Sequence, residues 1–273
     1  MVDVKVMRTA LLVFVAAQLL PAQWFNYPTA GVPKKPDGSP NFAATAPRTR
    51  EGPLDLSGLW APVRNRTTAA AEGLESQLVN NTGPFWDFGS VVPGGLPYQP
   101  WAAEIQKKRH LDLAKDNPDV QCMPLGILQM HTHPFARRFL QTPGYLAILH
   151  ERDLEYRQIF TDGRPLLKDP QPSWNGYSTG KWVGDTLVVE TTGFRDGLWA
   201  DYYGSPLTTE AKITERFHRL DYGSLEIEMT VDDPKAYTKP WSAKIALALQ
   251  INTDLLEYVC LEGEKDSRHM VGK

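Results

Sequence analysis

From Arg137 onward the chain is a nearly continuous series of short strands, and no other feature restricts its possible folds as strongly. Apolar and polar residues alternate there with a period of two, and Gly, Pro and Asp separate the segments. The turn at Val183-Gly184-Asp185 is typical of a tight hairpin. We expect about eight strands or more, at positions 138–141, 145–151, 155–161, 177–182, 186–192, 210–220, 225–231, 243–251 and 256–261.

Such a series has to close on itself or cover its outer edges, because unpaired edge strands promote aggregation. An antiparallel β-barrel is the simplest solution. Residues 54–60 are expected to form an additional, earlier strand. One external helix is predicted over 101–116, where Pro100 suits the first turn and Asn117-Pro118 ends the helix. The predicted fold is therefore mainly β, with a single helix outside the barrel.

The N-terminal region does not resemble the rest of the fold. Residues 1–22 have the pattern of a secretory signal peptide, because Lys5 and Arg8 precede a short apolar run. A buried N-terminal helix is the alternative. Residues 23–53 are rich in Pro, Gly, Ser and Thr, which predicts an extended arm. We expect a periplasmic or secreted protein whose mature chain has no transmembrane segment.

These boundaries predict a simple domain organisation. The signal peptide and the arm precede one barrel domain at 54–273, which carries an inserted loop and helix at 64–118. The 273 residues include 29 basic and 32 acidic side chains, so the formal net charge of −3 gives no reason to expect a nucleic-acid partner. The chain has no P-loop, G-x-G-x-x-G, G-x-S-x-G or H-E-x-x-H motif, and no cofactor is predicted.

The two cysteines of the chain, Cys122 and Cys260, are too far apart for a zinc ribbon or a C-x-x-C redox motif. An even pair in an exported protein favours a disulfide. That bond would stabilise the fold by about 5 kcal/mol on the chain-entropy model. Two unpaired buried thiols are the alternative.

The expected first strand ends in Gly58-Leu59-Trp60. This G-x-W pattern resembles the opening of lipocalin barrels, whose Trp closes one end of the barrel. The resemblance implies a lipocalin-like barrel, although the insertion after the first strand departs from the lipocalin pattern.

Several longer segments carry a second resemblance. They are YRQIFTDGRP at 156–165, GDTLVVETTGF at 184–194, Thr214-Glu215-Arg216-Phe217 and DDPKAYTKPW at 232–241. In these segments, and over most of its length, the chain resembles a family of exported proteins abundant in soil bacteria such as acidobacteria. The resemblance implies export and a shared fold, and it implies no particular chemistry.

Strand parity identifies candidate functional side chains, because alternate residues share one face of a strand. Glu215 lies on the same face as Ile213 and Phe217, so burial should raise its pKa unless a cation pairs with it. Arg157 could be that partner, or it could bind an anionic ligand group. A structural ion pair involving Glu215 is the alternative to a role in acid–base catalysis.

Two further groups are weaker candidates. Glu190 shares a face with Val188 and is a possible catalytic acid or base if the protein is an enzyme. His131 and His133 would lie on one face of an extended segment and could bind zinc or copper, but ordinary loop histidines are the expected case. No metal site is therefore predicted.

The aromatic residues suggest what the barrel holds. We expect a small apolar or aromatic molecule in its interior, contacted by Trp60, Arg157, Trp182, Glu215 and Phe217. The main alternative is a periplasmic lyase, isomerase or hydrolase on the same barrel, with Glu215 or Glu190 as acid or base and Arg157 as electrostatic stabiliser. A third alternative is an envelope protein that captures a partner through its Pro-rich arm.

Overall fold

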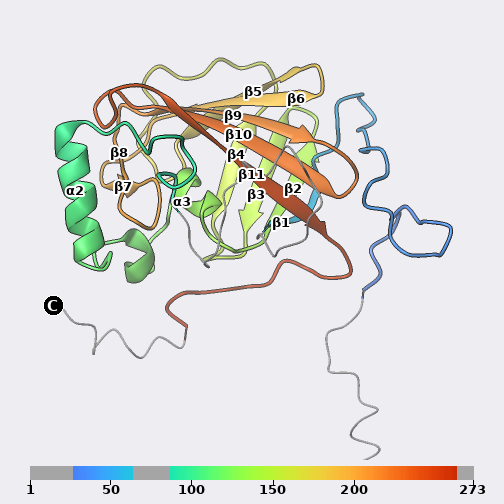
Figure 1. Ribbon diagram of the computed structural model, residues 1–273. Coiled ribbons are helices and arrows are strands. Elements are labelled where there is room, and N and C mark those ends of the chain that lie inside the picture. Colours follow the sequence, from blue (N-terminus) through green and yellow to red (C-terminus); the bar gives the residue numbers. More distant parts are fainter. Residues whose placement is uncertain (1–26, 64–86, 263–273) are drawn as a thin grey trace, which may run out of the picture.

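The computed structural model describes residues 27–63 and 87–262, and its main feature is a closed β-barrel (Figure 1). The predicted signal peptide at 1–22 lies outside the described residues, as does much of the predicted insertion at 64–118. Nine strands form the barrel: β1 (Gly58–Pro62), β2 (Arg137–Thr142), β3 (Tyr145–His150), β4 (Tyr156–Phe160), β5 (Tyr177–Val183), β6 (Thr186–Thr192), β9 (Lys212–Arg219), β10 (Ser224–Asp232) and β11 (Trp241–Gln250). They follow the order β1-β11-β10-β9-β6-β5-β4-β3-β2 around the ring. The predicted barrel is confirmed.

The odd number of strands has a geometric consequence. A ring of nine strands cannot alternate in direction all the way round, so one neighbouring pair has to be parallel. That pair is β4 and β5, and only Ile159↔Ser178 and Phe160↔Thr179 are in register. All other neighbours in the ring are antiparallel. We call this short parallel contact the seam.

The barrel core is built from the inward-facing residues of each strand. Burial alternates along β9, β10 and β11, as expected for strands with one face in a core. Trp60 and Phe217 are fully buried. The Nε1–H of Trp60 donates to the Leu56 carbonyl at 2.9 Å, and the Arg219 guanidinium lies over the Trp60 ring at 5.0 Å. Trp60 therefore packs inside the barrel.

Five smaller elements do not belong to the ring of strands. The helix α2 (Pro100–Leu111) lies at one side of the barrel beside the two-stranded sheet of β7 (Leu198–Trp199) and β8 (Pro206–Leu207) (Figure 1). A 3-10 turn, η1 (Pro118–Gln121), and a short helix, α3 (Ile127–His131), precede β2. None of the helices in the described ranges is long and apolar enough to cross a membrane.

Three predicted elements differ from the structure. The helix ends at Leu111 rather than at residue 116, because Leu113 and Ala114 have left-handed backbone angles of 55° and 56°. The expected strand at 54–60 begins only at Gly58. Residues 256–261 form no strand, because their β-type pairing is limited to an isolated bridge between Tyr258 and Arg152.

The ends of the described chain are held on the barrel surface. The arm hydrogen-bonds to the loop between β9 and β10, where Gly223 N–H donates to the Phe42 carbonyl at 2.8 Å. The C-terminal segment is held by the predicted disulfide between Cys122 and Cys260, whose Cα atoms are 5.4 Å apart. The alternative of two free thiols is therefore wrong.

Candidate functional site

A cleft of about 380 Å³ opens on the barrel wall at the seam. We call it the seam cleft. Its lining includes the aromatic side chains Tyr156, Phe160, Trp174 and Tyr177 and the polar side chains Glu155 and Ser178. The cleft lies where β4 and β5 pair over only two positions, so the wall is least continuous there. The Asn175 side-chain amide donates to the Tyr156 carbonyl at 3.2 Å and connects the two sides of the seam.

Aromatic rings form one wall of the cleft. The ring centroids of Phe160 and Tyr177 are 5.5 Å apart, and the Arg195 guanidinium lies 4.2 Å from the centroid of Trp174. The planes of the Phe160 and Tyr177 rings are tilted by 30°, and rings at this separation provide a large apolar surface at a fixed position. The seam cleft can therefore hold the flat face of a small molecule.

Glu155 supplies the most unusual polar group of this cleft. It is only 9% exposed, and its Oε1 accepts a hydrogen bond from the Leu125 backbone N–H at 3.0 Å. Its Oε2 is buried, and no hydrogen bond reaches it from the part of the chain that the structure describes. Burial, with a smaller contribution from the charge of Asp153, raises the pKa of Glu155 to about 7, although the Leu125 N–H, the charge of Arg152 and the nearby Asn175 side-chain amide act in the opposite direction. This carboxyl can therefore gain or lose a proton near neutral pH.

The turn that positions Glu155 is conformationally unusual. Asp153 and Leu154 connect β3 to β4 with φ angles of 52° and 55°, in the left-handed region that favours Gly or Asn. Leu154 is 57% exposed and lines the rim of the seam cleft. An exposed Leu in a strained position on a cleft rim suggests a contact role, because packing alone gives no reason for it.

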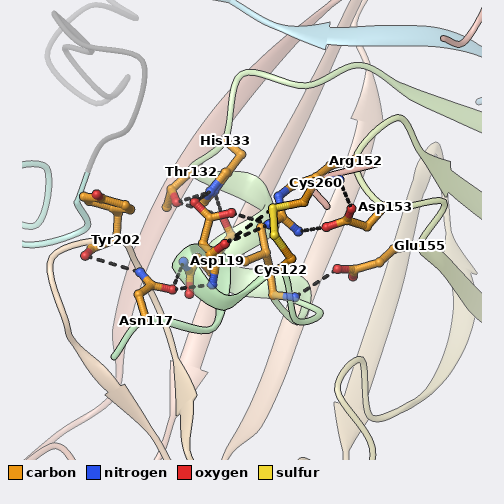
Figure 2. A network of polar contacts seen from close by, with 12 residues as sticks. Asn117, Asp119, Cys122, Thr132, His133, Arg152, Asp153, Glu155, Tyr202 and Cys260 are labelled. Atoms are coloured by element: carbon orange, nitrogen blue, oxygen red, sulfur yellow. Dashed lines mark hydrogen bonds and ion pairs between the residues drawn. A yellow bond between two sulfur atoms is a disulfide. The ribbon is translucent and has the colours of Figure 1, made fainter. Parts of the chain in front are cut away.

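A polar network holds this turn against η1 and the C-terminal segment (Figure 2). Arg152 forms ion pairs with Asp153 and with Asp119, and His133 Nε2 lies 3.2 Å from the Asp119 carboxylate. The Cys260 backbone N–H donates to the Asp153 carboxylate at 2.7 Å. The disulfide lies in the middle of this network in Figure 2 and links the two segments covalently.

Behind the seam cleft, the barrel interior contains a cluster of charged groups. The Arg157 guanidinium binds both oxygens of the Glu215 carboxylate, at 3.0 Å from Nη1 to Oε1 and at a shorter distance from Nη2 to Oε2. Arg157 Nη2 also donates to Thr191 Oγ1 at 3.1 Å and to Ser178 Oγ at 3.3 Å. Because Ser178 also lines the seam cleft, the cluster and the cleft share one wall residue.

The hydrogen bonds define the charge of His131. Arg137 Nη1 lies 2.7 Å from His131 Nδ1, and a guanidinium can only donate, so Nδ1 is the acceptor. The ring proton is then on Nε2, which donates to Glu215 Oε1 at 2.9 Å. Burial lowers the pKa of His131 to about 4, against the opposing effect of Glu215. His131 is therefore neutral.

Glu215 is permanently ionised in this arrangement. Its burial acts to raise the pKa, but the charge of Arg157 and the hydrogen bond from His131 outweigh burial and lower the pKa to about 2. The sequence suggested a raised pKa unless a cation pairs with Glu215, and the cation pair is present. A carboxylate with both oxygens bonded and a low pKa is a poor acid or base. The geometry favours a structural ion pair.

The other predicted site residues lie in different places. Phe217 and Trp60 pack in the core, and Trp182 lines a separate cleft of about 420 Å³ together with Leu187. Glu190 lies on the outer face of β6, where it pairs with Lys212, so the structure does not bring it near Glu215.

The two candidate metal ligands also separate. His131 ends α3 and contacts Glu215, whereas His133 contacts Asp119 and the Gln129 carbonyl. The segment is not extended, because His131 ends α3, so the condition under which the two rings would share one face is not met. Within 27–63 and 87–262, no group of three or more His, Cys, Asp or Glu side chains is arranged to hold a metal ion.

Glu155 was not among the predicted site residues, although the alternating pattern of its predicted strand contained the signal. The expected strand at 155–161 places Glu155 on the same face as Arg157 and Ile159, which is the reasoning that selected Arg157. The unpaired oxygen depends on the turn and on Leu125, and no local pattern indicates such a contact. The chain matches no protein-family model and has no significant sequence similarity to curated proteins. The site is therefore judged by its geometry.

Proposed function

We propose that this protein is an exported barrel protein that binds a small aromatic molecule in the seam cleft. The observation that carries the proposal is a cleft of about 380 Å³ that combines four aromatic side chains with the half-bonded carboxyl of Glu155. Small-molecule sites typically combine an apolar surface with a few polar groups that fix orientation. The disulfide supports an oxidising compartment.

The seam cleft is a better position for the ligand than the centre of the barrel. Trp60 and Phe217, two of the three aromatic residues expected to contact an interior ligand, are 0% exposed and packed against core neighbours. Tyr156 is 63% exposed at the cleft. A ligand at the seam can contact Glu155 and Ser178 without displacing a core side chain.

The test compares two tryptophans on different clefts. We expect calorimetry to detect binding of indole or p-cresol to the wild-type protein. Trp174→Ala should weaken that binding about ten-fold or more, because it removes a large contact surface. Trp182→Ala is the matched control, because Trp182 lines the other cleft, and it should leave the affinity unchanged. Absence of binding to the wild type, or equal loss in both variants, would contradict the proposal.

The enzyme alternative has one specific observation in its favour, the carboxyl of Glu155. A general acid or base works best when its pKa is near the working pH, and the pKa of Glu155 is raised to about 7. In this version of the proposal Glu155, rather than Glu215, is the acid or base of a lyase, isomerase or hydrolase. Its substrate would occupy the same seam cleft.

The raised pKa predicts a pH-dependent difference in stability. Because the folded-state pKa of about 7 lies above the ordinary 4.5, Glu155 lowers the free energy of unfolding as the pH rises between these values. Glu155→Gln keeps an acceptor for Leu125 and removes the charge. The variant should match the wild type near pH 4 and exceed its free energy of unfolding by about 1–3 kcal/mol near pH 8.

Denaturant unfolding at both pH values measures this difference, and the exposed Glu210 provides the control in Glu210→Gln. If the difference in free energy of unfolding between wild type and Glu155→Gln did not change with pH, the Glu155 carboxyl would have an ordinary pKa. The acid–base version of the proposal would then lose its support, while ligand binding in the seam cleft would still be tested by Trp174→Ala.

A further inference from the structure

Arg137 is a buried cation without an anionic partner in contact. Its side chain is 1% exposed, on the inner face of β2 between Trp60 of β1 and His150 of β3. No ion pair joins it to a carboxylate among the residues of 27–63 and 87–262. Burial lowers the pKa of Arg137 to about 10, so the guanidinium remains charged near neutral pH. An unpaired buried charge is strongly unfavourable and calls for a compensating anion.

One edge of the Arg137 guanidinium is nearly free. Nη1 donates to His131 Nδ1 at 2.7 Å, and Nη2 has only a long contact of 3.5 Å with the Met130 carbonyl. Nε is buried and has no hydrogen-bond partner among the described residues. The Nε–H and one Nη2–H point in the same direction, which is the fork that binds the two oxygens of a carboxylate side by side.

The surrounding charges favour a single negative charge. Arg137 and Arg157 contribute two positive charges and Glu215 contributes one negative charge, while His131 is neutral because its Nδ1 accepts from Arg137. The cluster therefore has a net charge of +1 among the described side chains. One monovalent anion would bring it to neutrality.

His150 provides a second donor beside Arg137. The two residues are direct partners across β2 and β3, and both side chains face the interior. His150 is 7% exposed, and no hydrogen bond to its ring occurs among the residues described. Burial lowers the pKa of His150 well below its ordinary value, with a further contribution from Arg137, so the ring is neutral and still has one N–H to donate.

We propose that Arg137 and His150 form a binding site for a small carboxylate inside the barrel. The carboxylate would accept two hydrogen bonds from the Nε and Nη2 edge of Arg137 and one from the His150 ring. This site is separate from the seam cleft and does not depend on the function proposed for that cleft. Its ligand class is a monovalent carboxylate of the size of formate or acetate.

Calorimetric titration of sodium formate into the wild-type protein, in a low-chloride buffer of large organic ions, tests the proposal directly. We expect saturable binding of one formate per chain and a rise in the thermal unfolding midpoint. Chloride should bind at least about ten-fold more weakly than formate, because a spherical ion cannot accept two parallel N–H groups at ideal geometry. Absence of formate binding, or equal binding of chloride, would overturn the carboxylate site.

Variants assign the binding to these two residues. Arg137→Met should reduce formate affinity about ten-fold or more. Arg138→Met is the matched control, because the neighbouring Arg138 pairs with Asp254 at the surface, and it should bind formate as the wild type does. His150→Phe should weaken binding by a smaller factor through loss of one donor. If Arg137→Met does not fold, Arg137→Lys keeps the charge without the fork, and wild-type affinity in that variant would overturn the assignment.

Discussion

Glu215 and Glu190 are the same residue type in environments that differ in access to water. Glu215 is 0% exposed and binds Arg157 and His131, whereas the Glu190 side chain is 40% exposed beside Lys212. Removing the charge of Glu215 leaves the Arg157 guanidinium buried and unpaired. Glu215→Gln should therefore lower the free energy of unfolding by about 3–5 kcal/mol. Glu190→Gln should change it by less than about 1 kcal/mol, because water already screens the surface pair.

Denaturant unfolding at neutral pH measures both changes, and a pH series adds an independent check. The folded-state pKa of Glu215, about 2, lies below the ordinary 4.5, so its contribution is complete above pH 4.5 and is lost as the pH falls toward 2. The difference in free energy of unfolding between wild type and Glu215→Gln should therefore decrease as the pH falls from 4.5 toward 2. If Glu215→Gln and Glu190→Gln lowered the free energy of unfolding by similar amounts at neutral pH, the buried pair of Glu215 with Arg157 would contribute no more to stability than the surface pair of Glu190.

A substitution at Leu154 has separate expected effects on the stability of the turn and on the affinity for a ligand. Its left-handed backbone should make Leu154→Gly stabilising by about 1 kcal/mol, because Gly adopts this conformation without steric strain. The same change removes an apolar side chain from the rim of the seam cleft and should weaken binding of indole or p-cresol.

Leu113→Gly is the control for this prediction, because Leu113 is also left-handed and is 86% exposed outside the seam cleft. It should raise the unfolding midpoint without changing the affinity. The rim role of Leu154 would be rejected if both variants bound the probe equally well.

The alternation of apolar and polar residues predicted which charged side chains lie inside the barrel. The alternation along β4 and β9 places Arg157 and Glu215 inside, because one face of each strand has to enter the core. Their direct contact was one of several open alternatives, since parity defines a face and does not define a distance. The free edge of Arg137 depends on α3, a short helix that the local pattern did not predict.

At the scale of elements, the seam is the weakest join in the barrel wall. Two residue pairs connect β4 to β5, whereas eight connect β9 to β10. Local opening is easiest where few hydrogen bonds are lost. Amides that face the seam should therefore exchange with solvent at least about ten-fold faster than the interior amides of β9 and β10, which corresponds to a difference of about 1.4 kcal/mol in opening free energy.

Hydrogen exchange followed by NMR or mass spectrometry measures this difference. A saturating aromatic ligand in the seam cleft should slow exchange at 158–160 and 177–179 and leave the β9–β10 region unchanged. Uniform protection around the ring would mean that the side chains at the seam compensate for the missing strand pairs.

Local pattern located most barrel strands because each alternates with a period of two, but it could not determine how they pair. The direction of β4 relative to β5 depends on the connection at 161–176, which carries the chain back before β5 begins. The segment at 256–261 has strand-like residues, yet in the nine-stranded ring β11 is already paired with both β10 and β1. Strand pairing is determined by the closed ring as a whole, so the local pattern at 256–261 led to the wrong prediction of a strand there.

For the whole molecule, closure is the property that the sequence predicted best. A long run of alternating segments with short turns requires a closed or covered sheet, and the barrel satisfies this requirement. The number of strands and the position of the seam depend on long-range contacts, such as the pairing of β1 with both β11 and β2. The seam cleft, and Glu155 beside it, were therefore not predictable from local pattern.

The arm is an addition to this closed structure, and its removal tests how far the barrel is self-sufficient. The described part of the arm reaches the barrel through backbone hydrogen bonds from Gly223 to Phe42 and from Tyr222 to Ala44, each 2.8 Å long. Further contacts are the exposed pair of Arg48 with Asp185 and two exposed hydrogen bonds between Thr29 and Asn252. None of these contacts belongs to the ring of strands.

Deletion of residues 27–49 should therefore leave the barrel folded, with a free energy of unfolding lower by about 2–3 kcal/mol, since each backbone hydrogen bond contributes about 1 kcal/mol. Near-ultraviolet circular dichroism should retain the signal of the buried aromatic residues, and indole affinity should not change, because no residue of 27–49 lines the seam cleft. A truncated protein that loses its near-ultraviolet signal would show that the arm is needed for closure. If the signal and the affinity persist, the arm is free to act as a separate interaction segment.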